Sequence, residues 1–364
     1  MITIKKVIII SWKNINQNVI HKNFANSLLK KYKVYFLDIT SVLDLKSKLP
    51  IKKKIKLLRN LKIIKIKNES HLKYEINQIK PSLIIPYFIE NYSLKTKKIF
   101  NQLKQLNVPL LKILDVAFTE VFDYYFLRVK QFFFKKIKYD YLIHVAQRSG
   151  QNFYSSRNNI YIHHYDFENY LEEIKKKKIK KKKYAVFLDE NFVYHPDLIR
   201  NKRKNWIKPK NYFESLNNFF NFFKKNFGLD VKIAAHPSVN KVHFKKFKSY
   251  YDSTAQLVKN AEIVFLHQST SLSYPILFRK KIIFLTSNEI NKTYLGKPIY
   301  NKSNFFNRLP LNLDNELNKK IIKKYVISNS IKYDEYINLF LKHPKSLKNN
   351  FANIFNEYFN KKKM

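Results

Sequence analysis

The amino-acid sequence predicts an α/β protein built from two doubly wound parallel sheets in tandem, followed by a C-terminal helix. Short apolar runs alternate with helix-like segments of about 10–15 residues, which is typical of parallel sheets with helices on both faces. Within the runs, apolar and polar residues do not alternate, as expected for strands that are covered on both sides. The alternation breaks at a lysine run, residues 175–183, and then begins again.

In the first half of the chain, each expected strand is a short apolar run and each expected helix has apolar residues three or four apart. The expected strands are residues 6–11, 33–38, 61–66, 83–86, 108–114 and 139–145. The expected helices are residues 17–31, 69–79, 95–106 and 127–138.

The second half repeats the pattern, with Gly228 expected to end an aromatic-rich helix. Its expected strands are residues 184–188, 231–235, 263–266 and 281–285. Its expected helices are residues 212–227, 253–260, 271–278 and 333–360. We therefore expect two Rossmann-like domains and two further segments. Their expected bounds are 1–165 and 184–330 for the domains, 166–183 for a lysine-rich linker and 331–364 for a C-terminal helical segment.

Charge and composition exclude several function classes. Lys and Arg number 71 against 26 Asp and Glu, a formal charge of +45, but only eight of the basic residues are arginine. Because a reader of bases or phosphates is expected to use more arginine, the excess fits a compositional bias of an AT-rich genome better than a nucleic-acid site. The chain has no cysteine and three glycines, so it has no thiolate chemistry and no glycine-rich nucleotide loop.

No apolar segment is long enough for a secretory signal or a transmembrane helix, and we expect a cytoplasmic protein. Residues 126–138 interleave aromatic residues with lysines, a pattern that favours peripheral contact with an anionic membrane face. The lysine run 175–183 is either a phospholipid-binding patch or, as we prefer, a solvated linker.

Carboxylates follow the first expected strand of the second half. Asp189 and Glu190 come directly after residues 184–188, and His195 follows shortly afterwards. A carboxylate at the carboxyl end of a buried strand can serve as a general base or a nucleophile. The alternative is an ordinary Asx turn or helix N-cap.

The next strands also end in polar groups. His236 and Pro237 follow residues 231–235, and proline would hold the imidazole at the rim, where it can donate to a phosphate. Ser269, Thr270 and Ser271 follow residues 263–266, where hydroxyls and backbone N–H groups at the start of a helix form an anion site. A capping histidine and a simple serine N-cap are the alternatives.

Metal ligands are not evident. The chain has no Asp-x-Asp pair and no His-x-x-x-His spacing, so no metal or other cofactor is expected. The one histidine–carboxylate group, His163-His164-Tyr165-Asp166, is interpreted as a surface segment.

The order of these motifs resembles the bacterial CMP-sugar glycosyltransferases of GT-B fold, which include sialyltransferases and Kdo transferases of capsule and lipopolysaccharide assembly. Asp189-Glu190 matches their acidic pair, His236-Pro237 their His-Pro motif and Ser269–Ser271 their Ser/Thr segment. Asn191 stands where the sialyltransferases have glycine, and the following Tyr-His-Pro-Asp looks more like the Kdo-transferring branch.

The resemblance implies metal-independent transfer of a CMP-activated ulosonic acid to a lipid-linked or oligosaccharide acceptor at the inner face of the cytoplasmic membrane. The second domain would bind the nucleotide sugar and the first the acceptor. His236 and the Ser269–Ser271 segment would hold the phosphate, and Asp189 would act as base or as nucleophile, which give opposite stereochemistry. Arg148 is the expected partner of the sugar carboxylate. The alternatives are a GT-B transferase that uses a UDP- or GDP-sugar and a basic nucleic-acid-binding protein.

Overall fold

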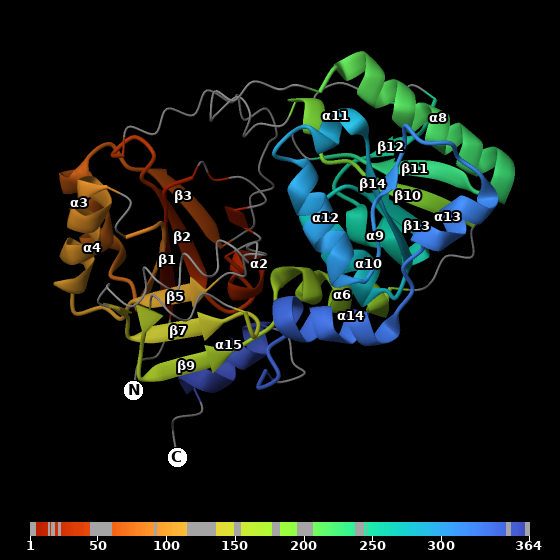
Figure 1. Ribbon diagram of the computed structural model, residues 1–364. Helices are drawn as coiled ribbons and strands as arrows, with labels where there is room; N and C mark the ends of the chain where they lie inside the picture. Colours follow the sequence, from red (N-terminus) through yellow and green to blue (C-terminus); the bar gives the residue numbers. More distant parts are fainter. Residues whose placement is uncertain are drawn as a thin grey trace. The chain divides into compact units, whose positions relative to one another are not determined.

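The computed structural model describes residues 5–13, 15, 19–20, 23–43, 60–90, 93–114, 136–148, 154–176, 183–194, 207–236, 244, 246–346 and 351–360. The chain forms two compact units. Unit 1 comprises Met1–Glu168 and Asn338–Met364, and unit 2 comprises Asn169–Ile337. The C-terminal residues therefore belong to the first unit. Each unit is described by itself below (Figure 1).

Unit 1 is a parallel α/β unit. Its main sheet has the strand order β3-β2-β1-β4 and continues through a bridge between Ile84 and Leu110 into the order β5-β7-β9. The strands of these two sheets are β1 (Lys6–Ser11), β2 (Lys33–Asp38), β3 (Leu61–Lys65), β4 (Leu83–Tyr87), β5 (Leu111–Leu114), β7 (Tyr141–His144) and β9 (Asn158–Tyr161). A separate parallel pair is formed by β6 (Ile137–Lys138) and β8 (Tyr154–Ser155).

Two apolar cores cover the two faces of this sheet, because successive side chains of a strand point to opposite sides. On one face, Ile8 and Ile10 of β1 belong to the core that includes α3 (Glu69–Ile79) and α4 (Leu94–Lys104). On the other face, Val7 and Ile9 pack in the core that includes α2 (Ala25–Leu28) and the C-terminal α15 (Phe351–Asn360). All of these β1 side chains are fully buried. The covering of both faces explains why the strands appear in the sequence as continuous apolar runs.

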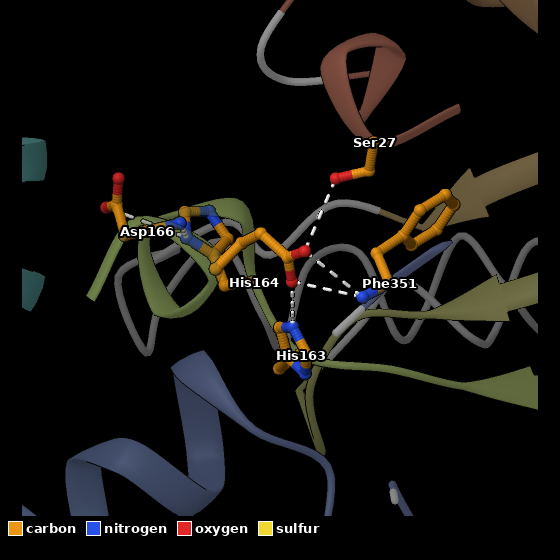
Figure 2. A network of polar contacts seen from close by, with 6 residues as sticks. Ser27, His163, His164, Asp166 and Phe351 are labelled. Carbon is orange, nitrogen blue, oxygen red and sulfur yellow. Dashed lines mark hydrogen bonds and ion pairs between the residues drawn. The ribbon is translucent and has the colours of Figure 1, made fainter. Parts of the chain in front are cut away.

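Helix α15 is tied to the rest of unit 1 by a buried carboxylate. Glu168 of α6 (Tyr165–Lys175) accepts hydrogen bonds from the Phe351 N–H (3.0 Å), from Ser27 Oγ (3.3 Å) and from His163 Nε2 (2.5 Å). Figure 2 shows Ser27, His163 and Phe351 converging on this point. His163, His164 and Asp166 are all buried, so the prediction of a surface segment here was wrong. The carboxylate needs these polar neighbours because it has lost its water.

Unit 2 contains one six-stranded, fully parallel sheet in the order β12-β11-β10-β13-β14-β15. Numbered within the unit, this order is 3-2-1-4-5-6, the arrangement of Rossmann-type sheets. The strands are β10 (Tyr184–Leu188), β11 (Asp230–Ala234), β12 (Ser249–Tyr250), β13 (Ile263–Leu266), β14 (Lys281–Thr286) and β15 (Leu311–Asn312). The helical segments are η2 (Phe192–Tyr194), α8 (Pro209–Phe227), α9 (Thr254–Asn260), η3 (Thr270–Leu272), α10 (Ser273–Leu277), α11 (Asn288–Asn291), α12 (Gly296–Phe305), α13 (Lys319–Tyr325) and α14 (Ser330–Tyr336).

Helix α8 packs against this sheet through an aromatic face. Phe219 and Phe220 are fully buried and lie 5.0 Å and 5.3 Å, between ring centroids, from Phe265 of β13 and Phe187 of β10 respectively. The helix ends at Gly228, whose φ of 65° is left-handed and whose N–H bonds Lys224 O at 3.0 Å, as the sequence predicted.

Several expected elements differ in the structure. Residues 137–138, expected at the end of a helix, form strand β6, and residues 126–135 lie outside the described part of the chain. The expected helix 17–31 is represented by α2, which starts after Phe24 in a left-handed conformation (φ 54°). Residues 165–175, assigned mainly to a linker, form α6, and the lysines 177–182 that follow are not described. The expected helix 333–360 is divided into α14, the π-helical η4 (Ile337–Leu341) and α15.

Candidate functional site

The carboxyl ends of three strands of unit 2 meet at the point where the strand order reverses. Strand β10 pairs with β11 on one side and with β13 on the other. Strands β11 and β13 lie on opposite sides of β10. Sheets with this strand order bind ligands beyond the carboxyl ends of the strands at such a reversal. The polar segments predicted from sequence follow β10, β11 and β13 at this edge. The topology therefore brings those segments to one place.

Asp189 connects the end of β10 to the end of β11. Its side chain is buried, and Oδ1 accepts the Asn191 N–H at 2.9 Å. The backbone N–H of His236 bonds the same carboxylate. Burial raises the pKa of Asp189, and these two N–H groups oppose that rise. Asp189 and His236 are thus in direct contact, and the His236 side chain is half-buried at the end of β11.

Asn191 supplies a backbone conformation that usually selects glycine. Its φ of 52° lies in the left-handed region, which asparagine enters more readily than most other residues. Its side-chain amide donates to Tyr194 O at 3.1 Å.

The Glu190 side chain binds the backbone that follows strand β13, on the other side of β10 from β11. Its Oε1 accepts the His267 N–H at 2.9 Å and the Gln268 N–H at 2.8 Å. Burial raises the pKa of Glu190 to about 8, against the opposing charge of Lys302 and the two N–H groups. The two adjacent carboxylates therefore separate, with Asp189 at the β11 end and Glu190 at the β13 end.

In the serine–threonine segment after β13, one hydroxyl already accepts a hydrogen bond from within the segment's own turn. Ser269 is buried and its Oγ accepts the Ser271 N–H at 3.1 Å, so Ser269 acts as the N-cap that the alternative reading described. Thr270 is exposed and Ser271 is half-buried. The α-helix that follows, α10, has only five residues and is preceded by the 3-10 turn η3. Any affinity for an anion must therefore come from N–H and hydroxyl groups more than from a helix dipole.

His267 is a structural residue at the base of this loop. Its Nδ1 lies 2.8 Å from Leu285 O, a group that only accepts, so Nδ1 carries the proton. Its Nε2 then accepts from the Tyr212 hydroxyl at 3.2 Å, and its ring stacks on Phe192 with 4.7 Å between centroids. Burial lowers the pKa of His267 to about 4.

Two residues of this cluster were not predicted from sequence. Tyr212, in the first turn of α8, lies close enough to Asp189 and Glu190 for their charges to raise its pKa, after the larger effect of burial. Lys302 of α12 is half-buried, lies close enough to Glu190 for their charges to interact, and donates to Gln268 O. Tyr212 was marked only as part of an amphipathic helix, and nothing in the sequence distinguishes Lys302 from the other lysines.

The remaining predicted residues lie elsewhere or outside the described residues. His195 and Pro237 are not described. Arg148 belongs to unit 1, where its side chain is exposed and its guanidinium carbon lies 5.5 Å from the centroid of the Phe340 ring.

Two features are absent from the part of the chain that the structure describes. No group of three or more His, Asp or Glu side chains in that part of the chain is arranged to hold a metal ion. No helix in it is both long enough and apolar enough to cross a membrane.

Comparison with known proteins gives the fold. No protein-family profile matches the chain, and no curated protein matches it. Among solved structures, a Listeria monocytogenes protein described as a UDP-N-acetylglucosamine 2-epimerase is similar over 99% of this chain and 98% of its own, with 10% identity and a TM-score of 0.53. The UDP-GlcNAc 2-epimerase of Methanocaldococcus jannaschii is similar over 96% and 98%, with 12% identity and a TM-score of 0.47. Acinetobacter baumannii MurG is similar over 99% and 100%, with 9% identity and a TM-score of 0.43. The Listeria likeness and the strand order of each unit agree: this chain has the GT-B fold, with two Rossmann-like domains.

Proposed function

We propose that the protein is a glycosyltransferase that transfers a sugar from a nucleotide-activated donor bound to unit 2. The observation that carries the proposal is the meeting of Asp189, His236 and the Ser269–Ser271 turn at the strand-order reversal of one parallel sheet. This edge is where Rossmann-type sheets bind nucleotides. The fold-level likeness to a protein described as acting on a nucleotide sugar supports the same class.

In this proposal the leaving phosphate lies between the end of β11 and the turn after β13. The imidazole of His236 and the hydroxyls of Thr270 and Ser271 donate to its oxygens, as donors aimed at developing negative charge do in other enzymes. Ser269 shapes the turn and Pro237 holds His236. Asp189 either removes the acceptor proton or attacks the sugar, and Glu190 supports it from the β13 side.

Two observations favour different nucleotide sugars as the donor. The motifs resemble transferases of CMP-ulosonic acids, and in that case His195 supports the donor. The Listeria protein is described as an epimerase of UDP-N-acetylglucosamine, and this description favours a UDP-sugar as the donor. A surface pocket in unit 2 next to Tyr212, lined by Asn211, Ser287 and Glu289, offers amide, hydroxyl and carboxylate groups for a nucleoside. We therefore propose a nucleotide sugar as the donor class, with a lipid-linked or oligosaccharide acceptor at an anionic membrane face.

A nucleotide screen on the full chain tests the proposal. Thermal unfolding is followed with CMP, UDP and GDP, each with and without EDTA. A ligand that binds only the folded chain, present at 100 times its Kd, stabilises it by about 2.7 kcal/mol, which is a clear shift in Tm. We expect one of the three nucleotides to stabilise the protein more than the others and expect EDTA to leave the shift in place. No shift with any nucleotide would overturn the proposal, whereas preference for CMP or for UDP decides between the donors.

A further inference from the structure

The backbone of Gln268 is held from both sides by ionisable side chains, Glu190 and Lys302. Its N–H donates to Glu190 Oε1 at 2.8 Å, and its carbonyl oxygen accepts from Lys302 Nζ. The preceding N–H, of His267, donates to the same Glu190 oxygen at 2.9 Å. One carboxylate from the end of β10 and one ammonium from α12 thus hold the N–H and C=O groups at the start of the loop that carries Ser269–Ser271.

This arrangement has a cost that the fold alone does not explain. Glu190 is buried and Lys302 is half-buried, and burial acts against the charge of each side chain. Buried ionisable groups are often no more stabilising than apolar groups of the same volume. Two such groups that bind the backbone of one residue at the carboxyl edge of the sheet are better explained by what they fix than by stability.

The loop itself gives the reason for fixing it. Gln268 leads directly to the Ser269 N-cap, whose Oγ accepts the Ser271 N–H. Rotation about the backbone bonds of Gln268 would therefore move the N–H and hydroxyl groups of Thr270 and Ser271. Donors that are already in place bind an anion more tightly because no ordering has to occur on binding.

We propose that Glu190 and Lys302 act together as a clamp on the backbone N–H and C=O of Gln268 and that this clamp orients the Ser269–Ser271 turn for the phosphate of the nucleotide. The proposal rests on the proposed function for its ligand, but the clamp itself is a property of the ligand-free chain. In this role Lys302 and Glu190 are positioning residues: neither needs to touch the phosphate.

Lys302 stands on a helix whose own position is fixed by a close contact. At Gly296, the first residue of α12, an added Cβ would lie 2.8 Å from Asn291 Cα, closer than real Cβ atoms approach backbone. Helix α12 can therefore approach α11 this closely only with glycine at position 296. Lysine at position 302 then reaches Gln268 O from the second turn of the helix.

The test is a comparison of the full-length wild type with the double variant E190Q/K302M. The double variant removes both charges at nearly constant volume, so neither charge is left buried and unpaired, and it should fold. As a matched control, K297M removes a lysine that is exposed on the same helix. We expect the double variant to bind the nucleotide chosen by the screen about tenfold or more weakly by calorimetry, the range expected for lost hydrogen bonds to charged groups. K297M should bind like the wild type.

Hydrogen exchange without nucleotide separates this inference from the proposed function. In the wild type the amides of His267 and Gln268 should exchange slowly, and in E190Q/K302M the exchange of the segment 267–272 should rise at least about tenfold while strand β14 keeps its protection. Equal exchange in this segment, or wild-type nucleotide affinity of the double variant, would overturn the clamp. If the wild type binds no nucleotide but the exchange rises as stated, the clamp stands and the proposed function fails.

If the double variant does not fold, the single variant E190Q replaces it in both measurements, since glutamine can still accept from the His267 and Gln268 N–H groups. It should bind the nucleotide and protect segment 267–272 at a level between wild type and a chain without the clamp. Wild-type behaviour of E190Q in both measurements would then overturn the role of the charge.

Discussion

Asp189 and Glu190 are adjacent in the sequence, yet their carboxylates bind groups on different strands. Asp189 accepts N–H groups of Asn191 and His236, and Glu190 accepts those of His267 and Gln268. Asp189 binds the backbone N–H of His236, whose imidazole is proposed to hold the phosphate. At the scale of single residues, we therefore propose Asp189 as the carboxylate that takes part in the chemistry.

Replacement of Asp189 by asparagine should abolish transfer and leave nucleotide binding intact. Asparagine keeps the volume and an acceptor for the Asn191 N–H, but it is neither a base nor a nucleophile. We expect sugar transfer in a single-turnover assay to fall by about 100-fold or more. The exposed Glu335 provides a matched control, E335Q, which should transfer normally. Near-normal transfer by the Asp189 variant would remove this residue from the reaction.

The imidazole of His236 should contribute to nucleotide affinity. If it donates to the leaving phosphate, His236→Ala loses a preorganised donor, and turnover should drop by about 100-fold with weaker nucleotide binding. The backbone N–H that bonds Asp189 remains in this variant, so the fold should persist. The measurement is titration calorimetry alongside turnover; unchanged nucleotide affinity would show that the side chain only caps the strand end.

His267 should make the stability of the chain depend on pH. Burial lowers its pKa in the folded chain to about 4, against an ordinary value of 6.5. Between those values the unfolded chain binds a proton that the folded chain does not, so stability is lost as the pH falls from about 6.5 to 4, by about 3 kcal/mol. In urea unfolding from pH 4 to 7, His267→Gln should show a shallower loss than the wild type. Identical slopes would mean that His267 is not neutral and buried as described.

The sequence predicted which polar residues follow the strand ends of unit 2 better than it predicted the groups that they contact. Asp189, His236 and Ser269–Ser271 could be found because each follows an apolar run at the edge where Rossmann-type sheets bind ligands. Lys302 could not be found, because its sequence carries no local signal and its role comes from a contact with residue 268 across the fold. Ser269 turned out to cap its own turn, a role that sequence cannot separate from ligand binding.

At the scale of elements, the C-terminal helix α15 depends on one buried carboxylate, Glu168. Burial by itself would raise the pKa of Glu168, but the hydrogen bond and charge of His163, with the N–H of Phe351 and the hydroxyl of Ser27, bring it below its ordinary value. Glu168→Ala should destabilise the chain by about 3 kcal/mol, because three donors lose their acceptor in the core. Glu172→Ala, on the same helix, serves as the control. A loss below about 1 kcal/mol in urea unfolding would contradict this role.

The two described glycines in element-forming positions should respond differently to alanine. Gly228 has φ of 65° with open space around its Cα, so Gly228→Ala should cost about 1 kcal/mol of conformational strain. At Gly296 an added Cβ would meet the backbone of Asn291 at 2.8 Å, so Gly296→Ala must displace α12 and with it Lys302. We therefore expect only Gly296→Ala to weaken nucleotide binding in calorimetry. Equal affinities of the two variants would show that α12 can shift without effect on the site.

The elements that the sequence missed are short or depend on partners distant in the chain. Strands β8, β12 and β15 have two residues each, too few to show a periodicity. The prediction of a helix over residues 127–138 was wrong for its last two residues, Ile137 and Lys138. They form β6 and pair with Tyr154 and Ser155. Helix α15 was expected, but its place in unit 1 follows from packing such as the stack of Phe24 on Phe351, with 4.3 Å between ring centroids.

At the scale of the whole molecule, the central claim is that unit 2 binds the nucleotide of the donor at the reversal between β10 and β13. The formal charge of +45 makes weak binding of any polyanion expected, so affinity alone does not test the claim. The location of the bound nucleotide tests the claim instead. A map of which amides a nucleotide protects separates a site from general attraction.

The decisive measurement is hydrogen exchange of the full chain with and without CMP, UDP and GDP at near-physiological salt. We predict that one nucleotide slows exchange in the segments 189–194 and 267–272 of unit 2, while the corresponding strand ends of unit 1 change little. The same nucleotide should give less protection at residues 267–272 in the double variant E190Q/K302M at equal concentration, because that variant binds it more weakly. Protection confined to unit 1, or none from any nucleotide, would contradict the account.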